Sequence, residues 1–311
     1  MITSYPICLF LYNRPKLVIP CLDAISKSAK GHSIHLYIFV DGPKSEEDSF
    51  QVKDTLKKVN NYDFQSFDKV QIEETPKNKG LANSIIHGAT KVIEKYKKII
   101  VIEDDLIVSN NFVSFMIEAL MKYKENKKIG SISGFSFAIK STSNDDVYFH
   151  PRPNSWGWAT WEDRWKSVNW NVNEKYLNEI SYSKKSFNML GQDMDRMLKA
   201  YVYKKIDSWA IRWALCHWKY NWLALTPYKS KIINKGFGNN LATNTKSTNN
   251  FLIIFDESKQ FKDFKYPSEV KATERNIKIV NKFNSNLIRF LQNYLPNKLW
   301  NYINQKIFKY Y

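Results

Sequence analysis

Short apolar runs alternate with amphipathic stretches through the first part of the chain. Four apolar runs end in polar or turn-forming residues and are typical of buried strands: YPICLFLYNRP, HLYIFVDGPK, KVQIEETP and KKIIVIEDD. The stretches that follow them repeat apolar residues at helical spacing: KLVIPCLDAISKSA, SEEDSFQVKDTLKKV, GLANSIIHGATKVIEKY and NNFVSFMIEALMKYKEN. This alternation predicts an α/β fold, a doubly wound and mostly parallel sheet with helices on both faces.

The pattern changes near residue 141, and this change divides the chain into three parts. Residues 1–140 form the α/β half described above. Residues 141–255 hold most of the ten tryptophans without a helix or strand period, and are expected to form a second lobe of the same domain that covers the sheet edge. Residues 256–311 are expected to form a basic, amphipathic, helical tail.

Composition narrows the class of protein. An apolar content of 43% in 311 residues supports a large core. The net charge of +17 favours an anionic partner, such as nucleic acid, an acidic membrane or a phosphorylated ligand, although a lysine-rich genome would also produce it. The three cysteines are widely spaced, and the sequence has neither a signal-peptide pattern nor a membrane-spanning run, so a cytoplasmic location is expected.

Three acids, Glu103, Asp104 and Asp105, end the fourth predicted strand. Clustered carboxylates are costly at the end of a buried strand unless a cation neutralises them. Oxygen ligands of this kind suit Mg²⁺ or Mn²⁺, which complete their coordination with water and ligand phosphates. The alternative is a solvated turn whose acids stabilise the N-terminus of the following helix. The stretch alone leaves both interpretations open.

The other predicted strand ends also carry polar residues. Arg14 follows the first strand, where it would suit a diphosphate, and Asp41 follows the second, where it would accept from a base N–H. Lys79 and Gly80 stand at the entry to a helix, and a glycine-opened helix N-terminus favours phosphate. Ligands bind outside the carboxyl ends of parallel strands, so these residues are expected at one edge of the sheet. The sequence has no P-loop and no GxGxxG motif, which disfavours ATPase and Rossmann dinucleotide-binding functions.

In this order along the chain, the motifs resemble a GT-A-fold bacterial glycosyltransferase, similar to the Golgi N-acetylglucosaminyltransferase I family. The resemblance is carried by PICLFLYNRP, IFVDGP, NKGLANSI and VIEDDLIVSNNF, and it continues through SWGWATWEDRW, DSWAIRW and NKGFGNNLAT to about residue 245. It implies a metal-dependent enzyme of bacterial surface polysaccharide synthesis. Such an enzyme moves a hexosyl or N-acetylhexosaminyl group from a nucleotide-sugar to a hydroxyl of a glycan or lipid-linked acceptor. A UDP-sugar is the first candidate for the donor.

Position by position, the resemblance implies roles for the polar strand ends. Asp105 would ligate Mn²⁺ or Mg²⁺, and Asp104 would contact the ribose or the water shell of the metal. Glu103 would contact the sugar or the base of the site. Arg14 would reach the diphosphate and Asp41 the nucleotide base, while NKGLANSI would lie below the donor.

The family's general base is an acid just before a tryptophan of the second lobe. In KKIDSWAIRW the nearby acid is Asp207, but Ser208 stands directly before Trp209, so Glu162 and Asp163 in WATWEDRW are competing candidates. One positioned carboxylate suffices to deprotonate an acceptor hydroxyl as it attacks. The resemblance implies a single displacement that inverts the anomeric configuration.

The tryptophans of SWGWATW have two interpretations. Trp156, Trp158 and Trp161 would offer a stacking face to a sugar ring, or would pack in the core as large aromatics usually do. Gly157 indicates close approach of the backbone to a ligand or a strand. Further on, NKGFGNN reads first as a turn, and the resemblance makes it a loop that closes over the donor with Asn239 in contact.

The tail has no acid after Glu274. Apolar residues recur at helical spacing from Leu287 to Leu295 and from Trp300 to Phe308. A basic amphipathic helix suits an anionic membrane surface, which would place the protein peripherally on the inner face of the cell membrane, near a lipid-linked acceptor. A helix docked on the second lobe is the alternative.

Two other functions are compatible with parts of the sequence. A sugar nucleotidyltransferase shares the parallel sheet and the metal, but it normally carries a glycine-rich loop after the first strand, and LYNRPKLV has no glycine. A basic nucleic-acid- or carbohydrate-binding protein would explain the charge. However, the basic residues are dispersed, no RRM, KH or helix-turn-helix motif is present, and three acids lie at the ligand edge. Nucleic acid is therefore not an expected partner.

Overall fold

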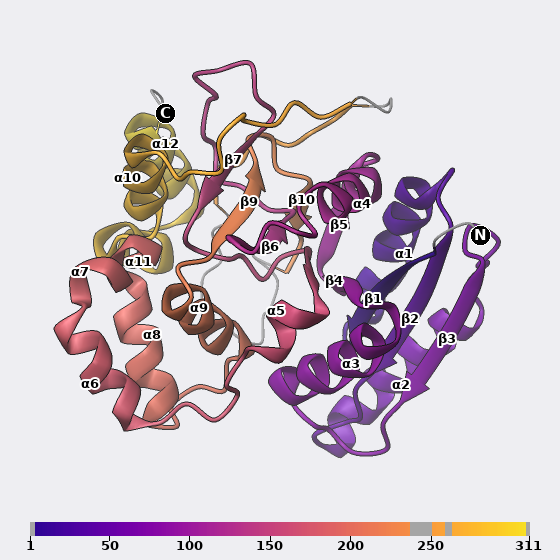
Figure 1. The fold of residues 1–311 in the computed structure, drawn as a ribbon. Coiled ribbons are helices and arrows are strands. Elements are labelled where there is room, and N and C mark those ends of the chain that lie inside the picture. Colours follow the sequence, from indigo (N-terminus) through magenta and orange to yellow (C-terminus); the bar gives the residue numbers. More distant parts are fainter. Residues whose placement is uncertain (1–3, 237–250, 259–262, 309–311) are drawn as a thin grey trace.

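An eight-stranded mixed sheet runs through the molecule (Figure 1), in the order β3-β2-β1-β4-β8-β6-β9-β7. The structure is a computed structural model that describes residues 4–236, 251–258 and 263–308. Four of the seven strand pairings are parallel, which confirms the predicted α/β class with a mostly parallel sheet. The strands are β1 (Tyr5–Leu11), β2 (Ile34–Val40), β3 (Lys69–Glu74), β4 (Lys98–Glu103), β6 (Ile129–Ser133), β7 (Val147–His150), β8 (Trp158–Trp161) and β9 (Leu223–Pro227).

The amino-terminal half of the sheet is parallel. β1 pairs with β2 and with β4, and β2 pairs with β3. Ile7 and Leu9 of β1 face one core, and Cys8 and Phe10 face the other. A strand buried on both faces is apolar throughout, which explains the continuous runs in the sequence. The carboxyl ends of β1, β2 and β4 meet at one edge of the sheet, called the carboxyl edge below.

Helices cover both faces of the sheet, as predicted. Local sequence starts them: Pro15 occupies the first turn of one helix, and Ser45 Oγ caps the next by accepting from the N–H of Asp48 at 3.3 Å. Gly80 begins a third with a φ of 79°, a backbone region that glycine adopts readily. One face carries α1 (Pro15–Ala29), α2 (Glu46–Asn60) and α4 (Phe112–Lys122), and the other carries α3 (Leu81–Tyr96) and α9 (Trp209–Lys219).

The second part of the chain contributes three of the eight strands, β7, β8 and β9, instead of only covering the sheet edge. β8 lies between β4 and β6 and is antiparallel to both, with Trp158 opposite Val101. β9 is parallel to β6, and β7 ends the sheet antiparallel to β9. The described parts of residues 1–140 and 141–255 therefore share one sheet. Beside the carboxyl edge, β5 (Leu106–Val108) and β10 (Ile232–Asn234) form a separate antiparallel pair.

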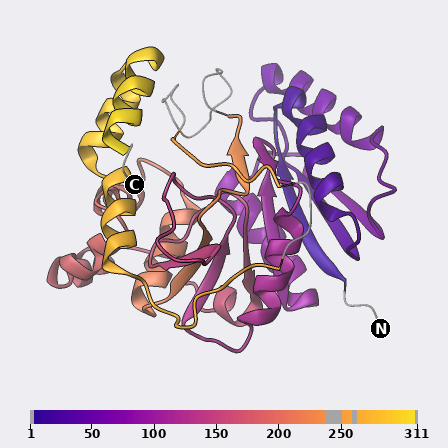
Figure 2. The same cartoon turned by 90° about the horizontal axis from the view of Figure 1, so that it is seen from above.

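A helical lobe and a helical tail complete the described part of the chain. The lobe packs Phe187, Leu198 and Leu215 into a core of its own. The tail helices lie on the opposite side of the molecule from α1 and α2 (Figure 2). Among the described residues, no helix is long and apolar enough to cross a membrane. The lobe contains α5 (Glu162–Lys166), α6 (Glu174–Tyr182), α7 (Lys184–Phe187), the 3-10 helix η1 (Asn188–Leu190) and α8 (Asp193–Val202), and the tail contains α10 (Glu274–Phe283), α11 (Asn286–Tyr294) and α12 (Asn297–Phe308).

Candidate active site

Arg14 bridges two of the acids at the end of β4. Its Nη1 lies 2.8 Å from Asp104 Oδ1 and 3.0 Å from Asp105 Oδ2. Asp104 Oδ2 also accepts from the backbone N–H of Tyr12 at 3.3 Å. Glu103 is the last residue of β4, next to the end of β1. The carboxyl edge therefore gathers Arg14 and all three acids in one place, as expected for the ends of neighbouring parallel strands.

Burial raises the pKa values of the three acids in this cluster. It raises the pKa of Asp104 to about 6, with Arg14 opposing the shift and Asp105 adding to it. Burial also raises the pKa of Asp105, against the opposing effect of Arg14. The pKa of Glu103 rises well above its ordinary value, first because of burial and then because both aspartates repel its charged form. Three carboxyls against one guanidinium favour a further cation at this point.

The segment from Asn234 to Gly236 lies against Asp105. The N–H of Lys235 donates to the Asp105 carbonyl at 2.7 Å, and the Asn234 side chain hydrogen bonds to the Asp105 carboxylate. A Cβ on Gly236 would overlap Asp105 Oδ2, so the backbone can come this close only as glycine. Asn234, the first residue of NKGFGNN, was given no role from the sequence. Asn239 lies outside the described residues.

These residues fit a divalent cation that is held jointly with a ligand. Within the described chain, no group of three or more histidine, cysteine or acidic side chains is arranged to hold a metal ion. Mg²⁺, however, usually takes one or two carboxylates and completes its shell with phosphate oxygens and water. Asp104 and Asp105 offer two carboxylates that share one arginine nitrogen. Of the two, Asp105 has the more accessible side chain, 14% exposed against 7% for Asp104.

Asp41, at the end of β2, holds the loop that starts α3. Its Oδ1 accepts from the N–H of Gly42 at 3.0 Å, the N–H of Lys79 at 2.8 Å and Thr75 Oγ1 at 3.0 Å. Its Oδ2 accepts from the N–H of Gly80 at 3.1 Å. The carboxylate thus positions Lys79 and Gly80 through their backbones, and the three predicted residues lie together. Oδ2 has one donor among these contacts and retains capacity for a ligand N–H.

A hydrogen-bonded group beside Arg14 was not found from the sequence. Tyr12 Oη donates to Asp48 Oδ2 at 2.6 Å, and Asn13 Nδ2 donates to Asp48 Oδ1 at 2.7 Å. Tyr12 Oη also accepts from the N–H of Lys44 at 3.2 Å. These contacts tie the loop after β1 to the start of α2 and fix the Tyr12 ring beside the site. Only the fold brings these segments together, because no local pattern links them.

Asp207 lies toward the same edge, at the start of α9. The rings of Trp209, in the first turn of α9, and Trp158, at the start of β8, are 5.1 Å apart, and Trp158 lies opposite the second half of β4. The N-terminus of α9 therefore faces the carboxyl edge. Ser208 caps α9 by accepting from a backbone N–H at 3.4 Å, which gives the serine before the tryptophan a structural role. Asp207 pairs with Arg212 at 3.0 Å and keeps 58% of its side chain exposed.

The structure does not bring Glu162 and Asp163 to this edge. The N–H of Glu162 donates to the carbonyl of Lys97 at 3.1 Å, at the beginning of β4, whereas Glu103 ends that strand. β4 has six residues and is therefore about 20 Å long. Glu162 also forms ion pairs with Lys97 at 2.9 Å and Lys166 at 2.8 Å. Both acids thus lie at the opposite edge of the sheet from the cluster.

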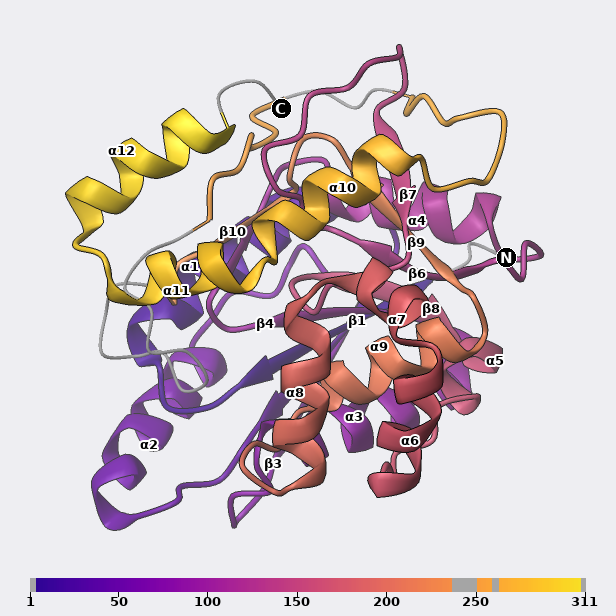
Figure 3. The ribbon, with the colours of Figure 1, turned by 90° about the vertical axis from the view of Figure 1, so that its left-hand side faces the viewer.

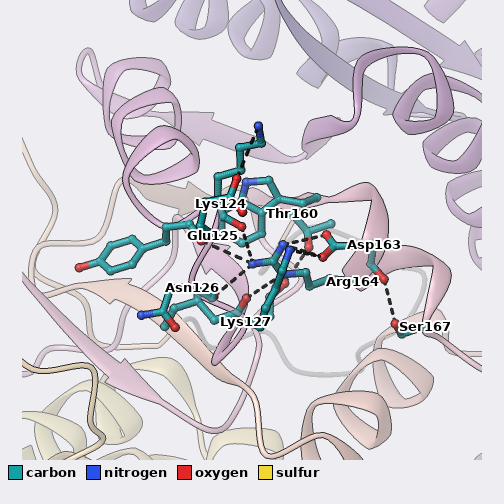
Figure 4. A network of polar contacts seen from close by, with 12 residues as sticks. Lys124, Glu125, Asn126, Lys127, Thr160, Asp163, Arg164 and Ser167 are labelled. Carbon is teal, nitrogen blue, oxygen red and sulfur yellow. Dashed lines mark hydrogen bonds and ion pairs between the residues drawn. The ribbon is translucent and has the colours of Figure 1, made fainter.

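Asp163 belongs to a network around the buried Arg164 (Figure 4). Arg164 Nη1 lies 2.7 Å from Asp163 Oδ1, and its Nη2 donates to the carbonyls of Lys124 at 2.8 Å and Asn126 at 3.1 Å. Lys127 Nζ lies 2.7 Å from Asp163 Oδ2. This network fastens α5 to the turn after α4, which gives Asp163 a structural role.

Two of the three tryptophans of SWGWATW are core residues. Trp158 and Trp161 are buried, and Trp156 is half-buried. Gly157 has a φ of 59°, and a Cβ there would lie 2.6 Å from Ile232 Cδ1, so its backbone approaches β10. Of the three, Trp156 is the one with surface left for a ligand.

No protein-family model matches the sequence, and no curated protein matches it. Partial likeness to solved structures includes the mannosyltransferase PcManGT from Pyrobaculum calidifontis in complex with GDP-Man and Mn2+, at 10% identity and a TM-score of 0.35 over 52% of this chain and 45% of that chain. S. aureus TarS 1-349 in complex with UDP has 11% identity and a TM-score of 0.31 over 46% and 39%. The galactosyltransferase LgtC, in complex with donor and acceptor sugar analogs, has 9% identity and a TM-score of 0.35 over 68% and 69%.

Two of these proteins are named as sugar transferases, but all three similarities are distant. The chain spans less than half the length of the first two. The α/β class follows from the strand order of the sheet, and the candidate site is defined by its own contacts. The finer likeness to the N-acetylglucosaminyltransferase I family stays a prediction from the sequence.

Proposed function

We propose that this chain is a glycosyltransferase that moves a hexosyl or N-acetylhexosaminyl group from a nucleotide-sugar. A UDP-sugar is the first candidate for the donor. The acceptor would be a hydroxyl of a glycan or lipid-linked sugar in bacterial surface polysaccharide synthesis. The observation that carries the proposal is the buried cluster of Arg14, Asp104 and Asp105 at the carboxyl edge. Sheets of this class bind ligands at that edge, and acids beside an arginine suit a diphosphate with a divalent metal.

The donor would lie across the ends of β1, β2 and β4. Arg14 would bind the diphosphate and stabilise its charge as it leaves. Asp105 would hold Mn²⁺ or Mg²⁺, and Asp104 would contact the ribose or the metal's water. When bound, the cation would supply positive charge to the leaving diphosphate. Glu103 would contact the sugar or the base of the site.

The nucleotide base would lie beside the loop that Asp41 organises. Asp41 Oδ2 would accept from a base N–H, and the backbones of Lys79 and Gly80 would border the donor. Tyr12, held by its hydrogen bonds at the end of β1, would contact the nucleotide from the other side. Asn239, in the segment after Gly236, would also contact the donor.

On the acceptor side, Asp207 is the proposed general base. Its carboxylate is 58% exposed and lies at the end of α9 that faces the carboxyl edge. Residues 141–255, which include Asp207, are the part of the chain predicted to bind the acceptor. A base placed across the edge from the departing diphosphate would deprotonate a hydroxyl that attacks from the opposite side of the sugar. The product would then have inverted anomeric configuration.

Titration calorimetry with UDP, with and without Mn²⁺, tests the donor site. We expect UDP to bind more tightly with Mn²⁺, and Asp105→Asn to weaken the Mn²⁺-dependent affinity by about 100-fold. The fold should withstand this change, because it removes one charge from a cluster of buried acids. Asp163→Asn is the matched control, since it makes the same chemical change at the other edge of the sheet.

The same titration with GDP, CMP and dTDP decides which base the site takes. Binding of one of these nucleotides in place of UDP would change the proposed donor but would not contradict the proposed metal site. Failure of every nucleotide, with and without Mn²⁺, would contradict the proposed function.

We further propose that the tail binds an anionic membrane surface, near a lipid-linked acceptor. Ile288 of α11 is buried against the rest of the molecule. The opposite face of the same helix exposes large apolar side chains, with 67% of Leu287, 58% of Phe290 and 73% of Tyr294 accessible. The sequence after Glu274 contains lysines and arginines but no acid. An exposed apolar stripe within a basic segment suits anionic lipid.

Flotation with phosphatidylglycerol vesicles tests the membrane proposal. The double change Leu287→Ser and Phe290→Ser removes two large apolar groups, each able to contribute about 1.5 kcal/mol or more when it enters lipid. We expect this variant to lose at least about 90% of the vesicle-bound fraction. Tyr182→Ser, which alters an apolar residue 91% exposed on α6, should float like the unchanged protein. Equal flotation of the double variant and the unchanged protein would remove the proposal.

A further inference from the structure

Two arginines pair with one buried aspartate where the tail meets the helical lobe, and a third arginine lies near them. Asp193, at the start of α8, receives two hydrogen bonds from Arg152, which follows β7, at 2.7 and 3.0 Å. Arg289 of α11 reaches the same carboxylate at 3.4 Å. Arg196, one turn further along α8, is exposed and repels the charge of Arg289. Figure 3 shows α10 and α11 passing the ends of α7 and α8. These three arginines and Asp193 are called the arginine cluster below.

The arginine cluster carries more positive than negative charge. Asp193 is its one carboxylate among the described residues, against three guanidiniums. Burial by itself would raise the pKa of Asp193, but Arg152 and Arg289 hold it below its ordinary value. The pKa of Arg289 falls to about 10 because of burial, with Asp193 opposing the shift and Arg152 and Arg196 adding to it. Two positive charges are therefore left for an anion to neutralise.

The cluster is built in advance of any ligand. Gly191 has a φ of 138°, and a Cβ there would overlap Arg152 Nη1 and lie 2.6 Å from Asp193 Oδ1, so the backbone lies directly against this ion pair. Arg289 Nη2 also donates to Asn284 Oδ1 at 2.8 Å. Its Nη1 lies 3.5 Å from Gln292 Oε1, and the Arg289 side chain remains 22% exposed. A fixed and partly exposed guanidinium suits a phosphoryl group.

The arginine cluster lies on the acceptor side of the candidate active site. The Arg289 guanidinium stacks 4.6 Å above the ring of Phe251, and that ring lies 5.8 Å from the ring of Trp156. Trp156 precedes Gly157, which packs against Ile232 of β10. β10 in turn pairs with β5, the strand that directly follows Glu103, Asp104 and Asp105. Contacts through Phe251, Trp156 and the β10–β5 pair thus link Arg289 to the carboxyl edge.

We propose that Arg289 and Arg196 bind a phosphoryl group carried by the acceptor. Arg152, whose Nη atoms already donate to Asp193 and the Leu190 carbonyl, would add positive charge beside them. Calling this ligand the acceptor rests on the proposed function; the anion site itself does not. A phosphate or diphosphate would accept hydrogen bonds from Arg289 and balance the excess charge that Asp193 leaves. Such a group belongs either to a lipid-linked sugar diphosphate or to a soluble phosphorylated sugar.

Calorimetric titration of the full chain with inorganic pyrophosphate, in buffer with EDTA, tests the site. We expect binding that Arg289→Gln weakens by at least about tenfold, since it removes a charged donor pair. Arg196→Gln, a change on the surface that cannot disturb folding greatly, should weaken binding in the same direction. Arg275→Gln is the control, because it removes the same charge elsewhere in the tail, where Arg275 donates to the carbonyl of Lys140.

Two further titrations make the outcomes separable. Geranyl diphosphate that binds more tightly than pyrophosphate assigns the site to a lipid-borne acceptor, and equal affinity assigns it to a soluble one. UDP with Mn²⁺ should bind all three variants as it binds the unchanged protein, so a failure of the proposed function would be seen there and not in the pyrophosphate titration. Absence of pyrophosphate binding, or an equal loss in Arg275→Gln, would overturn the anion site.

Discussion

Replacing Asp207 with asparagine is expected to lower the rate constant of sugar transfer by about 1,000-fold, or about 4 kcal/mol in activation free energy. Asparagine has nearly the same shape and can still accept a hydrogen bond from Arg212, which lies 3.0 Å from Asp207. It cannot, however, take the proton of the acceptor hydroxyl. The UDP affinity in the presence of Mn²⁺ should not change, because Asp207 stands on the acceptor side of the site.

The two competing acids supply the control for this prediction. Glu162→Gln and Asp163→Asn change ion pairs at the opposite edge of the sheet, so transfer should continue at nearly the unchanged rate. The measurement is kcat for transfer, with the donor that a screen of nucleotide-sugars identifies, alongside UDP titration of each variant. An Asp207→Asn enzyme of undiminished kcat, or a large loss in Glu162→Gln, would move the general base elsewhere.

Much of the parallel half of the fold could be predicted, because its strands are buried on both faces and their apolar runs stand out. The run from Ile7 to Leu11 and the acids after Ile102 mark strands whose ends share one edge of the sheet. The antiparallel insertion of β8 could not be predicted in this way. Its sequence, Trp158 to Trp161, has no strand period, and its place between β4 and β6 depends on which distant segments pack together.

The candidate site divides along the same line. Residues that end parallel strands, such as Arg14, Asp41 and Asp105, could be placed at one edge from the order of motifs. The contacts that define their chemistry could not, because each joins segments far apart in the sequence. Arg14 bridges two carboxylates about 90 positions away, and Asn234 reaches Asp105 from the second half of the chain. Pairings of this kind leave no trace in a local pattern.

Acid is expected to destabilise this protein through two buried histidines. His150, at the end of β7, is 2% exposed, and His217, in α9, is 0% exposed. Burial lowers the pKa of each to about 3, and the charge of Arg152 adds to the shift of His150. In the unfolded chain both imidazoles return to a pKa near 6.5. Both histidines therefore stay neutral in the native protein while the unfolded chain takes up protons.

The sign follows from proton uptake by the unfolded chain. A group whose pKa is lower in the native state loses stability as pH falls below the unfolded value, here from about 6.5 downward. Between pH 7 and pH 5 each histidine should remove about 2 kcal/mol from the free energy of unfolding, and the pair about 4 kcal/mol. Asp104 acts in the opposite direction, because its pKa is raised to about 6 and protonation relieves the crowded acids.

Urea unfolding at pH 7 and pH 5, compared between variants, isolates the histidines, because the contribution of Asp104 is common to every protein measured. His150→Gln and His217→Gln should each shrink the pH-dependent loss by about 2 kcal/mol, whatever their stability at pH 7. His87→Gln, which removes an imidazole 53% exposed on α3, should leave the loss unchanged. If the two buried-site variants lose as much stability on acidification as the unchanged protein does, the histidines are not the groups that set its acid sensitivity, and the acids at the carboxyl edge would have to be tested next.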